Sequence, residues 1–316
     1  MAVYVNTNYS ALQGQRYLGN VQNSLTTTYQ RLSSGMRINS AKDDAAGLQI
    51  ADRLTSQING LNQGNRNASD GIALAQTVEA GMDEISGMLQ KIRTLAVQAN
   101  NGTNTMEDKK ALTKEATALA TEINRISKQT TFAGKTVLNG GQDNSIAPPA
   151  NKQDNGKSQT ITLQVGSNKG DTISFKLENF LFSKIAENGK IANAVADEFA
   201  DDGSKTFKHA ADGSSIGVLF SVADAPAKII EFMDKMIGYV DGQRADLGAI
   251  QNRLESSIRN QSNVAANEAD ARSRIRDADF AEESANLSQQ SIIQQAAASM
   301  LMQANTRPQL GLSLLG

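Results

Sequence analysis

Cysteine and tryptophan are absent from this sequence, and the aromatic residues together make up only 4% of it. Without cysteine, neither disulfides nor thiolate chemistry can contribute. With so few rings, a large core filled by aromatic side chains is not expected, so Ala, Leu, Ile, Met and Val at helical spacing must supply the packing. The composition therefore favours helices that pack through aliphatic side chains.

An excess of charge of either sign is also lacking, because 31 Lys and Arg residues stand against 33 Asp and Glu residues. The chain has no global charge that would recruit nucleic acid or an anionic membrane. No stretch is long and apolar enough to span a bilayer, and the first residues show no basic start followed by an apolar run. We expect no nucleic-acid partner, no membrane partner and no cleaved secretory signal.

The residue patterns that usually carry enzymatic chemistry are missing. His209 is the only histidine and is expected at the surface in a Gly- and Asp-rich loop, without the second histidine that a zinc site needs. Acidic neighbours such as Asp43 and Asp44, or Glu282 and Glu283, fit helix starts or solvated charges. We therefore predict no catalytic residue, no metal site, no cofactor and no enzyme activity.

Both ends of the chain are poor in charge. No acidic residue precedes Asp43, and the segment from Ser284 to Gly316 carries a single charge, on Arg307. Solvated helices normally carry charges on their outer faces, whereas a disordered polar tail would lack apolar residues at helical spacing. Tails of this kind favour burial in an assembly, because an unpaired buried charge costs several kcal/mol. The residues expected to be buried are Leu18, Val21, Leu25 and Leu32 in the first tail and Leu287, Ile292, Ile293, Met300 and Leu301 in the last.

The stretch from Arg31 to Leu54 separates a first amphipathic helix from a much longer second one. Gly35 suits the left-handed conformation that closes a helix, and Asn39 also allows a turn. Ser40 with Asp43 fits a helix-start signal, and Asp43 and Asp44 place negative charge near the positive end of the helix dipole. We predict that this junction holds a short helix and a long helix at a fixed angle.

Apolar residues repeat at helical spacing over both ends of the chain. The second helix, from about Asp44 to Ala99, has a heptad seam broken once between Ala75 and Val78. A turn at Asn100–Gly102 and a cap at Thr105 predict a third helix, antiparallel to the second. The other expected helical segments are a first helix from about Val5 to Leu32, a seam from Ile229 to Gln261, and a last helix from about Ala278 to Ala304 that ends before Pro308.

The helical period gives way to alternation in the middle of the chain. The runs Ile161–Val165 and Ile173–Leu177 both alternate apolar and polar residues and flank a Gly-containing loop, which predicts a β-hairpin. A surface loop at 140–156, a helix at 185–199 and a strand at 216–222 are also expected. The predicted fold class is mainly α, with long coiled-coil or bundle helices from both chain ends and a small α+β insert in the middle.

Two long segments resemble one family. The run RLSSGMRINSAKDDAAGLQIADRLTSQINGLNQGNRNASDGIALAQTVE, followed by IRTLAVQANNGT, closely resembles bacterial flagellin, and so does the C-terminal run from RADLGAIQNRLESS to QANTRPQLGLSLLG. Together the matches cover most of residues 1–139 and 226–316. In the middle, only LQVGSNKGDTI is similar to the family, at its hairpin region.

This resemblance implies a structural subunit that polymerises into the extracellular bacterial flagellar filament, which drives swimming. Residues 1–42 and 277–316 would form an inner tube, residues 43–139 and 226–276 a surrounding long-helix domain, and residues 140–225 a β-hairpin and outer variable domain. The implied partners are further copies of the chain, an export chaperone, cap proteins and hook-junction proteins. Export would proceed unfolded, through the flagellar type III apparatus.

The resemblance also gives a candidate receptor surface. In family members that activate Toll-like receptor 5, this surface lies on the helix containing the match to IRTLAVQAN and on the next helix. By position, the candidate receptor-binding residues are Lys91, Leu95 and Glu115. Lys91 replaces an Arg that is frequent in activating members, and Lys lacks the bidentate fork of Arg. Packing between subunits is the expected main role of all three residues, and receptor recognition is a hypothesis.

Some features depart from the family or leave alternatives. Gln243, Gln261 and Glu268 stand where flagellins commonly carry Leu. Their side chains would weaken the packing, admit water into it, or meet a polar partner.

The main alternative function is a hook–filament junction protein or another axial flagellar protein. A cytosolic coiled-coil signalling protein would show charged outer faces at both tails, and an enzyme would need a polar constellation in the insert.

Overall fold

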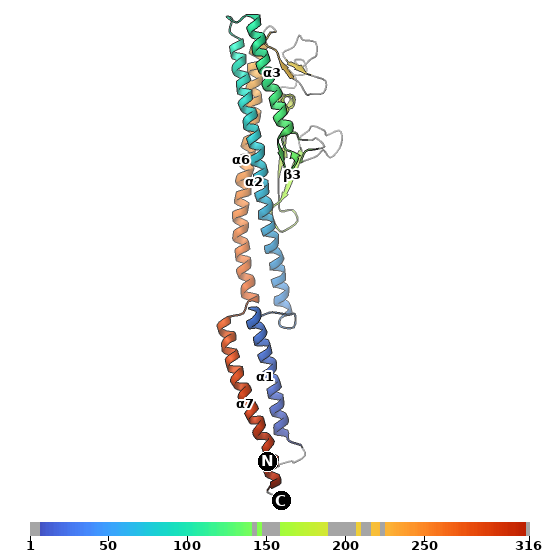
Figure 1. The fold of residues 1–316 in the computed structure, drawn as a ribbon, viewed down its shortest axis with the longest axis vertical. Helices are drawn as coiled ribbons and strands as arrows, with labels where there is room; N and C mark the ends of the chain where they lie inside the picture. The colour runs from blue at the N-terminus through green and yellow to red at the C-terminus, as the bar shows by residue number, and fades with distance from the viewer. Residues whose placement is uncertain are drawn as a thin grey trace. The chain divides into compact units, whose positions relative to one another are not determined.

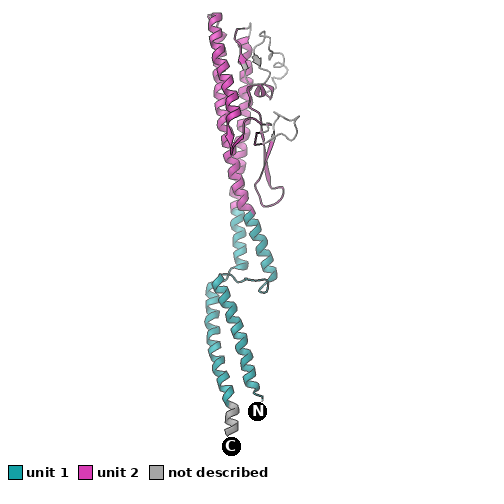
Figure 2. Ribbon diagram, turned by 45° about the vertical axis from the view of Figure 1, so that its right-hand side comes forward, with its two compact units in different colours: residues 1–59, 263–316 teal, residues 60–262 magenta. Residues whose placement is uncertain are grey.

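The computed structural model describes residues 7–140, 144–146, 159–188, 207–209, 216–221 and 225–313. The chain divides into two compact units: unit 1 comprises residues 1–59 and 263–316, and unit 2 comprises residues 60–262 (Figure 2). Helices α2 (Ala45–Ala99) and α6 (Ala225–Arg276) each contribute to both units. The predicted fold class, mainly α with a small strand-containing middle, is confirmed.

Unit 1 pairs α1 (Tyr9–Ser34) with α7 (Phe280–Ser313), two helices from opposite ends of the sequence that lie side by side (Figure 1). The expected helix start near Val5 lies outside the described residues. α1 begins at Tyr9, where the Asn8 side chain accepts a hydrogen bond from the Ala11 N–H at 3.1 Å. The helix ends as predicted at Gly35, which has a φ of 69°.

The second helix begins next to the expected start at about Asp44, and not at the signal formed by Ser40 and Asp43. Asp43 closes a separate turn, in which its carboxylate accepts hydrogen bonds from the backbone N–H groups of Asn39 and Ser40 at 3.1 and 2.9 Å. α2 begins at Ala45, and Asp44 caps it by accepting from the Gly47 N–H at 2.9 Å. The expected start at about Asp44 is therefore confirmed, and only the start signal at Ser40 and Asp43 is wrong, because Asp44 directly precedes the helix and satisfies a free N–H of the first turn.

The predicted end of the last helix before Pro308 is also wrong, since α7 continues to Ser313. Proline has no N–H, so the Ala304 carbonyl four residues earlier loses its usual helical donor. Asn8 replaces that donor, because its Nδ2 donates to the Ala304 carbonyl oxygen at 2.8 Å. A side chain at the start of α1 thus compensates for the proline in α7.

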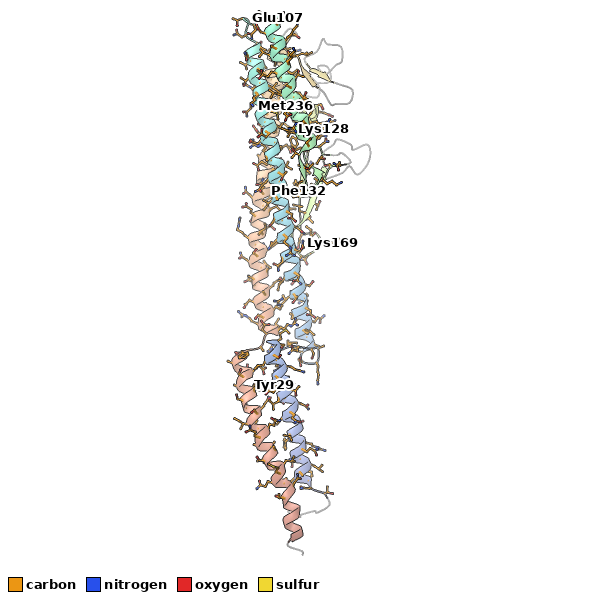
Figure 3. All side chains as sticks on the ribbon, viewed as in Figure 1. Tyr29, Glu107, Lys128, Phe132, Lys169 and Met236 are labelled. Atoms are coloured by element: carbon orange, nitrogen blue, oxygen red, sulfur yellow. The ribbon has the colours of Figure 1, made fainter. Side chains whose placement is uncertain are left out.

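Unit 2 packs its part of α2 against α3 (Met106–Gln129) and its part of α6 (Figure 1). The Thr105 cap is confirmed, because Thr105 and Asp108 form a reciprocal capping box. The core is mostly aliphatic, with a few Phe side chains near the insert, and Figure 3 labels one of its methionines, Met236. Among its largest fully buried side chains are Met82, Ile85, Leu89, Ile92, Ile123, Leu138, Leu177, Phe182, Ile185 and Phe220.

The predicted β-hairpin is confirmed as β3 (Gln159–Gln164) and β4 (Thr172–Leu177), which pair in antiparallel fashion. The hairpin approaches α2 closely at Gly64, where an added Cβ would come within 2.0 Å of the Val165 carbonyl oxygen. Asn67 Nδ2 also donates to the Gln164 carbonyl oxygen at 2.9 Å. Gly64 therefore leaves room on α2 for the hairpin backbone, and the Asn67 amide binds that backbone.

The remaining insert predictions are only partly covered by the described residues. The expected helix at 185–199 overlaps α4, and residues 189–199 of that expected helix lie outside the described part of the chain. Most of the expected loop at 140–156 also lies outside it. Of the strand expected at 216–222, only Ile216–Val218 is confirmed. It pairs with an unpredicted strand, so the backbone of His209 lies in a strand and not in a loop. The elements concerned are α4 (Phe182–Ala186), β5 (Phe207–His209), β6 (Ile216–Val218) and an unpredicted small hairpin, β1 (Thr131–Phe132) with β2 (Lys135–Thr136).

Candidate assembly surface

The candidate functional surface is built on the α1–α7 pair of unit 1. Less exposed positions recur on both helices at alternating intervals of three and four residues, which is the spacing by which two helices pack in a coiled coil. These positions are named the seam. On α1 the seam comprises Ala11, Gly14, Leu18, Val21, Leu25, Thr28 and Leu32, and on α7 it comprises Glu283, Leu287, Gln290, Gln294, Ala297, Leu301 and Ala304.

Contacts across the seam follow an antiparallel order. Near the start of α1, an added Cβ on Gly14 would lie 3.1 Å from Leu301 Cδ1. Farther along α1, Thr28 Oγ1 donates to Gln290 Oε1 at 3.3 Å. Residues later in α1 therefore meet residues earlier in α7, and one register relates the two helices.

One ion pair lies at the end of this otherwise uncharged interface. Arg31 Nη1 donates to Glu283 Oε1 at 3.0 Å, and the two side chains are 31% and 8% exposed. Arg31 Nε and Glu283 Oε2 are also buried and have no hydrogen-bond partner within the described residues. A register that separated the two charges would leave one of them unpaired away from water, so the pair disfavours slippage of α1 along α7.

α7 carries a second apolar face in addition to its seam. Ile292, Ile293 and Met300 are 67%, 42% and 70% exposed, and the exposed Ala296 lies between them in sequence. Ile293, Ala296 and Met300 are spaced by three and four residues and so share one side of the helix. The set of Ile292, Ile293, Ala296 and Met300 is named the open face. No charged residue occurs from Ser284 to Thr306, so covering this face would take no charge of this segment out of water.

α1 also exposes large apolar side chains. Tyr9, Leu12, Tyr17 and Tyr29 are each more than half exposed, and Figure 3 labels Tyr29 on α1. Exposed apolar side chains gathered on one unit are typical of surfaces that bind another protein. The residues predicted for assembly fall into two groups: Leu18, Val21, Leu25, Leu32, Leu287 and Leu301 lie on the seam, whereas Ile292, Ile293 and Met300 lie on the open face.

The two chain segments that lead into the α1–α7 pair bond to each other. Met36 and Asp277 form an antiparallel bridge, and the Arg37 N–H donates to the Arg276 carbonyl oxygen at 2.7 Å. The Gly35 carbonyl oxygen accepts from the Ala278 N–H at 3.0 Å. Gly35 therefore supports the junction through both its left-handed conformation and its carbonyl group.

Asn39 and Asp43 stabilise the rest of the junction with their side chains. Asn39 Nδ2 donates to the Met36 carbonyl oxygen at 3.2 Å. Hydrogen bonds from the backbone N–H groups of Ser40 and Asn39 hold the pKa of the Asp43 carboxyl below its ordinary value. This contribution to stability is present above the ordinary Asp pKa and is lost as the pH falls through the lowered pKa.

The polar residues found where Leu was expected have different surroundings. Gln261 Nε2 donates to Ser257 Oγ at 3.0 Å within α6, while its Oε1 is buried without a partner in the described part of the chain. Glu268 Oε2 is likewise buried without a described partner. Gln243 borders an open groove beside β4. Gln261 thus makes its described hydrogen bond within its own helix and not across to another one.

The candidate receptor residues all lie in unit 2. Lys91 and Leu95 are on α2, and Glu115 is on α3. Lys91 and Glu115 are exposed, whereas Leu95 is partly buried against the core. Two charged side chains are therefore accessible, and Leu95 contributes to packing within the subunit.

Unit 2 also has two open grooves. One, of about 720 Å³, lies between α2 and α3 and is lined largely by small side chains. The other, of about 450 Å³, lies between β4 and α6 and is lined by charges of both signs, including Lys176, Glu178, Asp246 and Arg253. Burial raises the pKa of Glu178, and burial with the Glu178 charge raises the pKa of Tyr239 to about 12. Both shifts favour the protonated, uncharged forms.

The described residues contain neither a metal site nor a membrane span. Within them, no group of three or more His, Cys, Asp or Glu side chains is arranged to hold a metal ion. None of the helices in that part of the chain is long and apolar enough to cross a membrane.

Sequence reasoning missed several residues that organise unit 1. Asn8 bonds to both helices of the pair, and Glu283 and Gln290 occupy seam positions on α7. Met36 and Asp277 form the bridge between the two chain segments that lead into the α1–α7 pair. An available signal was the presence of Asn just before the first apolar repeat, since Asn is a favoured helix cap. The contacts between chain ends leave no local signal.

Two family models match the chain. The model for the bacterial flagellin N-terminal helical region matches residues 5–143, and the model for the C-terminal helical region matches residues 230–315. Flagellin A of Vibrio anguillarum is 36% identical over 380 residues, and Flagellin B of the same species is 37% identical over 377 residues. Polar flagellin C of Vibrio parahaemolyticus is 34% identical over 390 residues. Each of these alignments covers 100% of this chain and 100% of the relative.

One of two similar solved structures supports a shared fold. A putative flagellar hook-associated protein from Vibrio parahaemolyticus aligns with a TM-score of 0.55 at 16% identity, covering 74% of this chain and 100% of that one. The crystal structure of Bacillus cereus flagellin aligns with a TM-score of 0.43 at 26% identity, covering 64% of this chain and 94% of that one. At 16% identity, the likeness to the hook-associated protein supports a common fold and says nothing about a common role.

Proposed function

Because this chain belongs to the bacterial flagellin family, the structural proteins that polymerise into the extracellular flagellar filament, we propose that it assembles by covering the open face of α7 and the exposed apolar residues of α1 with neighbouring copies. The chain is a filament subunit used for motility and not an enzyme. The observation that carries the proposal is an exposed apolar face on a helix without charges from Ser284 to Thr306.

Burial of this surface is sufficient in scale to drive assembly. Each fully covered Ile, Leu or Met side chain contributes roughly 1.5 to 3 kcal/mol. Ordering a side chain costs about 0.5 to 2 kcal/mol, so a handful of well-packed residues in each tail leaves a net gain. An introduced charge on the open face would oppose this gain, because it would have to leave water without a partner.

We test the proposal with Ile293→Glu, which adds a charge at the open face. Polymerisation is followed by sedimentation and by electron microscopy, and we expect the variant to remain monomeric while the circular dichroism of unit 2 is unchanged. Ile293→Val controls for loss of a methylene, and Ala111→Glu adds the same charge at an exposed position of α3. Both controls should form filaments, and normal filaments from Ile293→Glu would refute the proposal.

The assignment of chain segments to filament layers extends the same proposal. Residues 1–42 and 277–316 form the inner tube, residues 43–139 and 226–276 the surrounding long-helix domain, and residues 140–225 the outer part. The absence of cysteine makes a labelling test direct. Ser288→Cys on α7 should react with maleimide in monomers and be protected in filaments, whereas Lys169→Cys, at the hairpin loop labelled in Figure 3, should react in both. Equal protection at both sites would contradict the assignment.

We further propose export through the flagellar type III apparatus, with an export chaperone inside the cell and cap and hook-junction proteins at the filament. Membership of the flagellin family supports this route. Deleting an essential gene of that apparatus should abolish surface protein while cell-associated chain persists. Unchanged amounts of extracellular chain after the deletion would exclude the route.

Recognition by Toll-like receptor 5 is proposed for the surface containing Lys91, Leu95 and Glu115. The exposure of Lys91 and Glu115 on unit 2 supports accessibility in the monomer. Reporter cells bearing the receptor should respond to monomeric protein, and Lys91→Ala with Glu115→Ala should lower the response. Lys114→Ala, at a neighbouring exposed position, serves as the matched control. No response to folded wild-type monomer would end the hypothesis.

A further inference from the structure

The methionines of the described residues differ widely in exposure, and Met36 is intermediate. Met82, Met233 and Met236 are at most 1% exposed in the core of unit 2. In contrast, Met300 and Met302 are 70% and 66% exposed on α7. Oxidants reach exposed thioethers first, so the two groups differ in their susceptibility to oxidation.

We propose that Met300, on the open face, is an oxidation site through which peroxide blocks incorporation of free subunits into the filament, whereas Met302, two residues on and outside the open face, oxidises without this effect. This inference rests on the proposed function, because it requires α7 to be buried on assembly. In the reaction, the thioether sulfur attacks one peroxide oxygen, the O–O bond breaks, and a sulfur–oxygen bond forms as water leaves. The sulfur is oxidised by two electrons to the sulfoxide, and hydrogen peroxide is reduced to water.

The sulfoxide changes the surface that must be buried. Met300 belongs to the open face together with Ile293 and Ala296, so a strong hydrogen-bond acceptor would replace an apolar group there. The hydroxyl of the adjacent Ser299 already donates to the Gln295 carbonyl oxygen at 3.1 Å. No Lys or Arg occurs from Ser284 to Thr306 to supply a charged donor. Burial of the sulfoxide would therefore be penalised unless a neighbouring copy supplied a donor.

Met106 provides an internal control. It is 57% exposed at the start of α3, beside Glu107 and Asp108, and so should oxidise as readily as the methionines of α7. Its charged surroundings are not part of the proposed apolar assembly surface. Oxidation at Met106 should therefore occur without an effect on polymerisation.

The experiment treats purified monomer with hydrogen peroxide, measures the sulfoxide at each methionine by peptide mass spectrometry, and then measures polymerisation on filament seeds. We expect Met300, Met302 and Met106 to oxidise at least about tenfold faster than Met82 and Met233. The critical concentration for polymerisation should rise at least about tenfold. Methionine sulfoxide reductase should restore it.

Variants separate the sites. Met300→Leu with Met302→Leu conserves volume and should polymerise with or without peroxide, whereas Met106→Leu should stay sensitive. Met300→Leu alone should remove the sensitivity, whereas Met302→Leu alone should keep it, so the test does not depend on the double variant alone. The inference is overturned if protein oxidised at Met300 and Met302 polymerises normally, if these residues do not oxidise first, or if the double variant stays fully sensitive. Failure of untreated protein to polymerise would instead refute the proposed function, and the inference with it.

Discussion

Asn8 uses both ends of its amide group. Its Oδ1 caps α1 through the Ala11 N–H, and its Nδ2 donates to the Ala304 carbonyl oxygen, which has no helical donor at Pro308. Asn8→Asp keeps an acceptor for Ala11 and removes the donor to Ala304. We predict that this change costs about 1 kcal/mol in unit 1 and speeds amide hydrogen exchange in the C-terminal part of α7.

A double-mutant cycle assigns this effect to the proline. Pro308→Ala restores an N–H to position 308, which can serve the Ala304 carbonyl. The cost of Asn8→Asp should therefore be smaller in the Pro308→Ala background when exchange and thermal dissociation are measured on filaments. An equal cost in both backgrounds would show that Asn8 does not compensate for the proline.

Gly35 is constrained by its backbone conformation and not by crowding. Its φ is 69°, and no neighbouring atom lies within 4 Å of an added Cβ. We predict that Gly35→Val alters filament curvature and swimming before it affects unit 2, because the left-handed conformation costs an ordinary residue about 1 to 2 kcal/mol. Electron microscopy measures the curvature. Gly35→Asn, which tolerates this conformation, is the control, and unchanged curvature and motility with Val would count against the prediction.

The seam pairs α1 with α7 through few polar contacts, so the register of the two helices depends on those contacts. Arg31 and Glu283 are the one ion pair that joins these helices among the described salt bridges. We predict that Glu283→Gln lowers the stability of the α1–α7 pair by about 1 to 2 kcal/mol, since a partly buried Arg31 would lose its counter-charge. The exchange Arg31→Glu with Glu283→Arg should recover part of the loss. Heat dissociation of filaments measures both variants, and an exchange as unstable as the single change would argue against a pairing role.

The sequence predicted elements whose signals are local. Alternation at Ile161–Val165 predicted the hairpin, and Thr105 predicted the start of α3. The end of α7 was not predictable in this way, because Pro308 is tolerated through a side chain from the other end of the chain. The start of α2 was predicted correctly at about Asp44, but the start signal at Ser40 and Asp43 was wrong, because only the fold shows that Asp43 closes a separate turn.

The same limit applies to the assembly surface. Low charge and helical spacing indicated that both tails would be buried. They did not distinguish seam residues, such as Leu287 and Leu301, from open-face residues, such as Ile293 and Met300. That division depends on where α1 covers α7, which is a contact between residues nearly 300 positions apart, as between Asn8 and Ala304. Sequence periodicity alone gives the faces of a helix and not the identity of what covers each one.

In the whole molecule, α7 has two proposed roles. Its seam packs against α1 within the subunit, and its open face contacts neighbouring copies. A truncation after Thr306 leaves both surfaces intact, one after Gln294 removes part of each, and one after Glu283 removes the whole open face and every seam position of α7 except Glu283. We predict a stepwise loss of polymerisation, with no filaments once residues 284–316 are removed, because α1 then lacks its partner and the open face is gone. Unit 2 should keep its helicity and its thermal transition by circular dichroism, since its core uses residues from 60–262 only. Seeds of full-length filament provide a growth assay in which nucleation is not limiting. Filaments of normal length from the chain ending at Glu283 would contradict the proposed role of α7, and loss of the unit 2 transition would show that the two units do not fold independently.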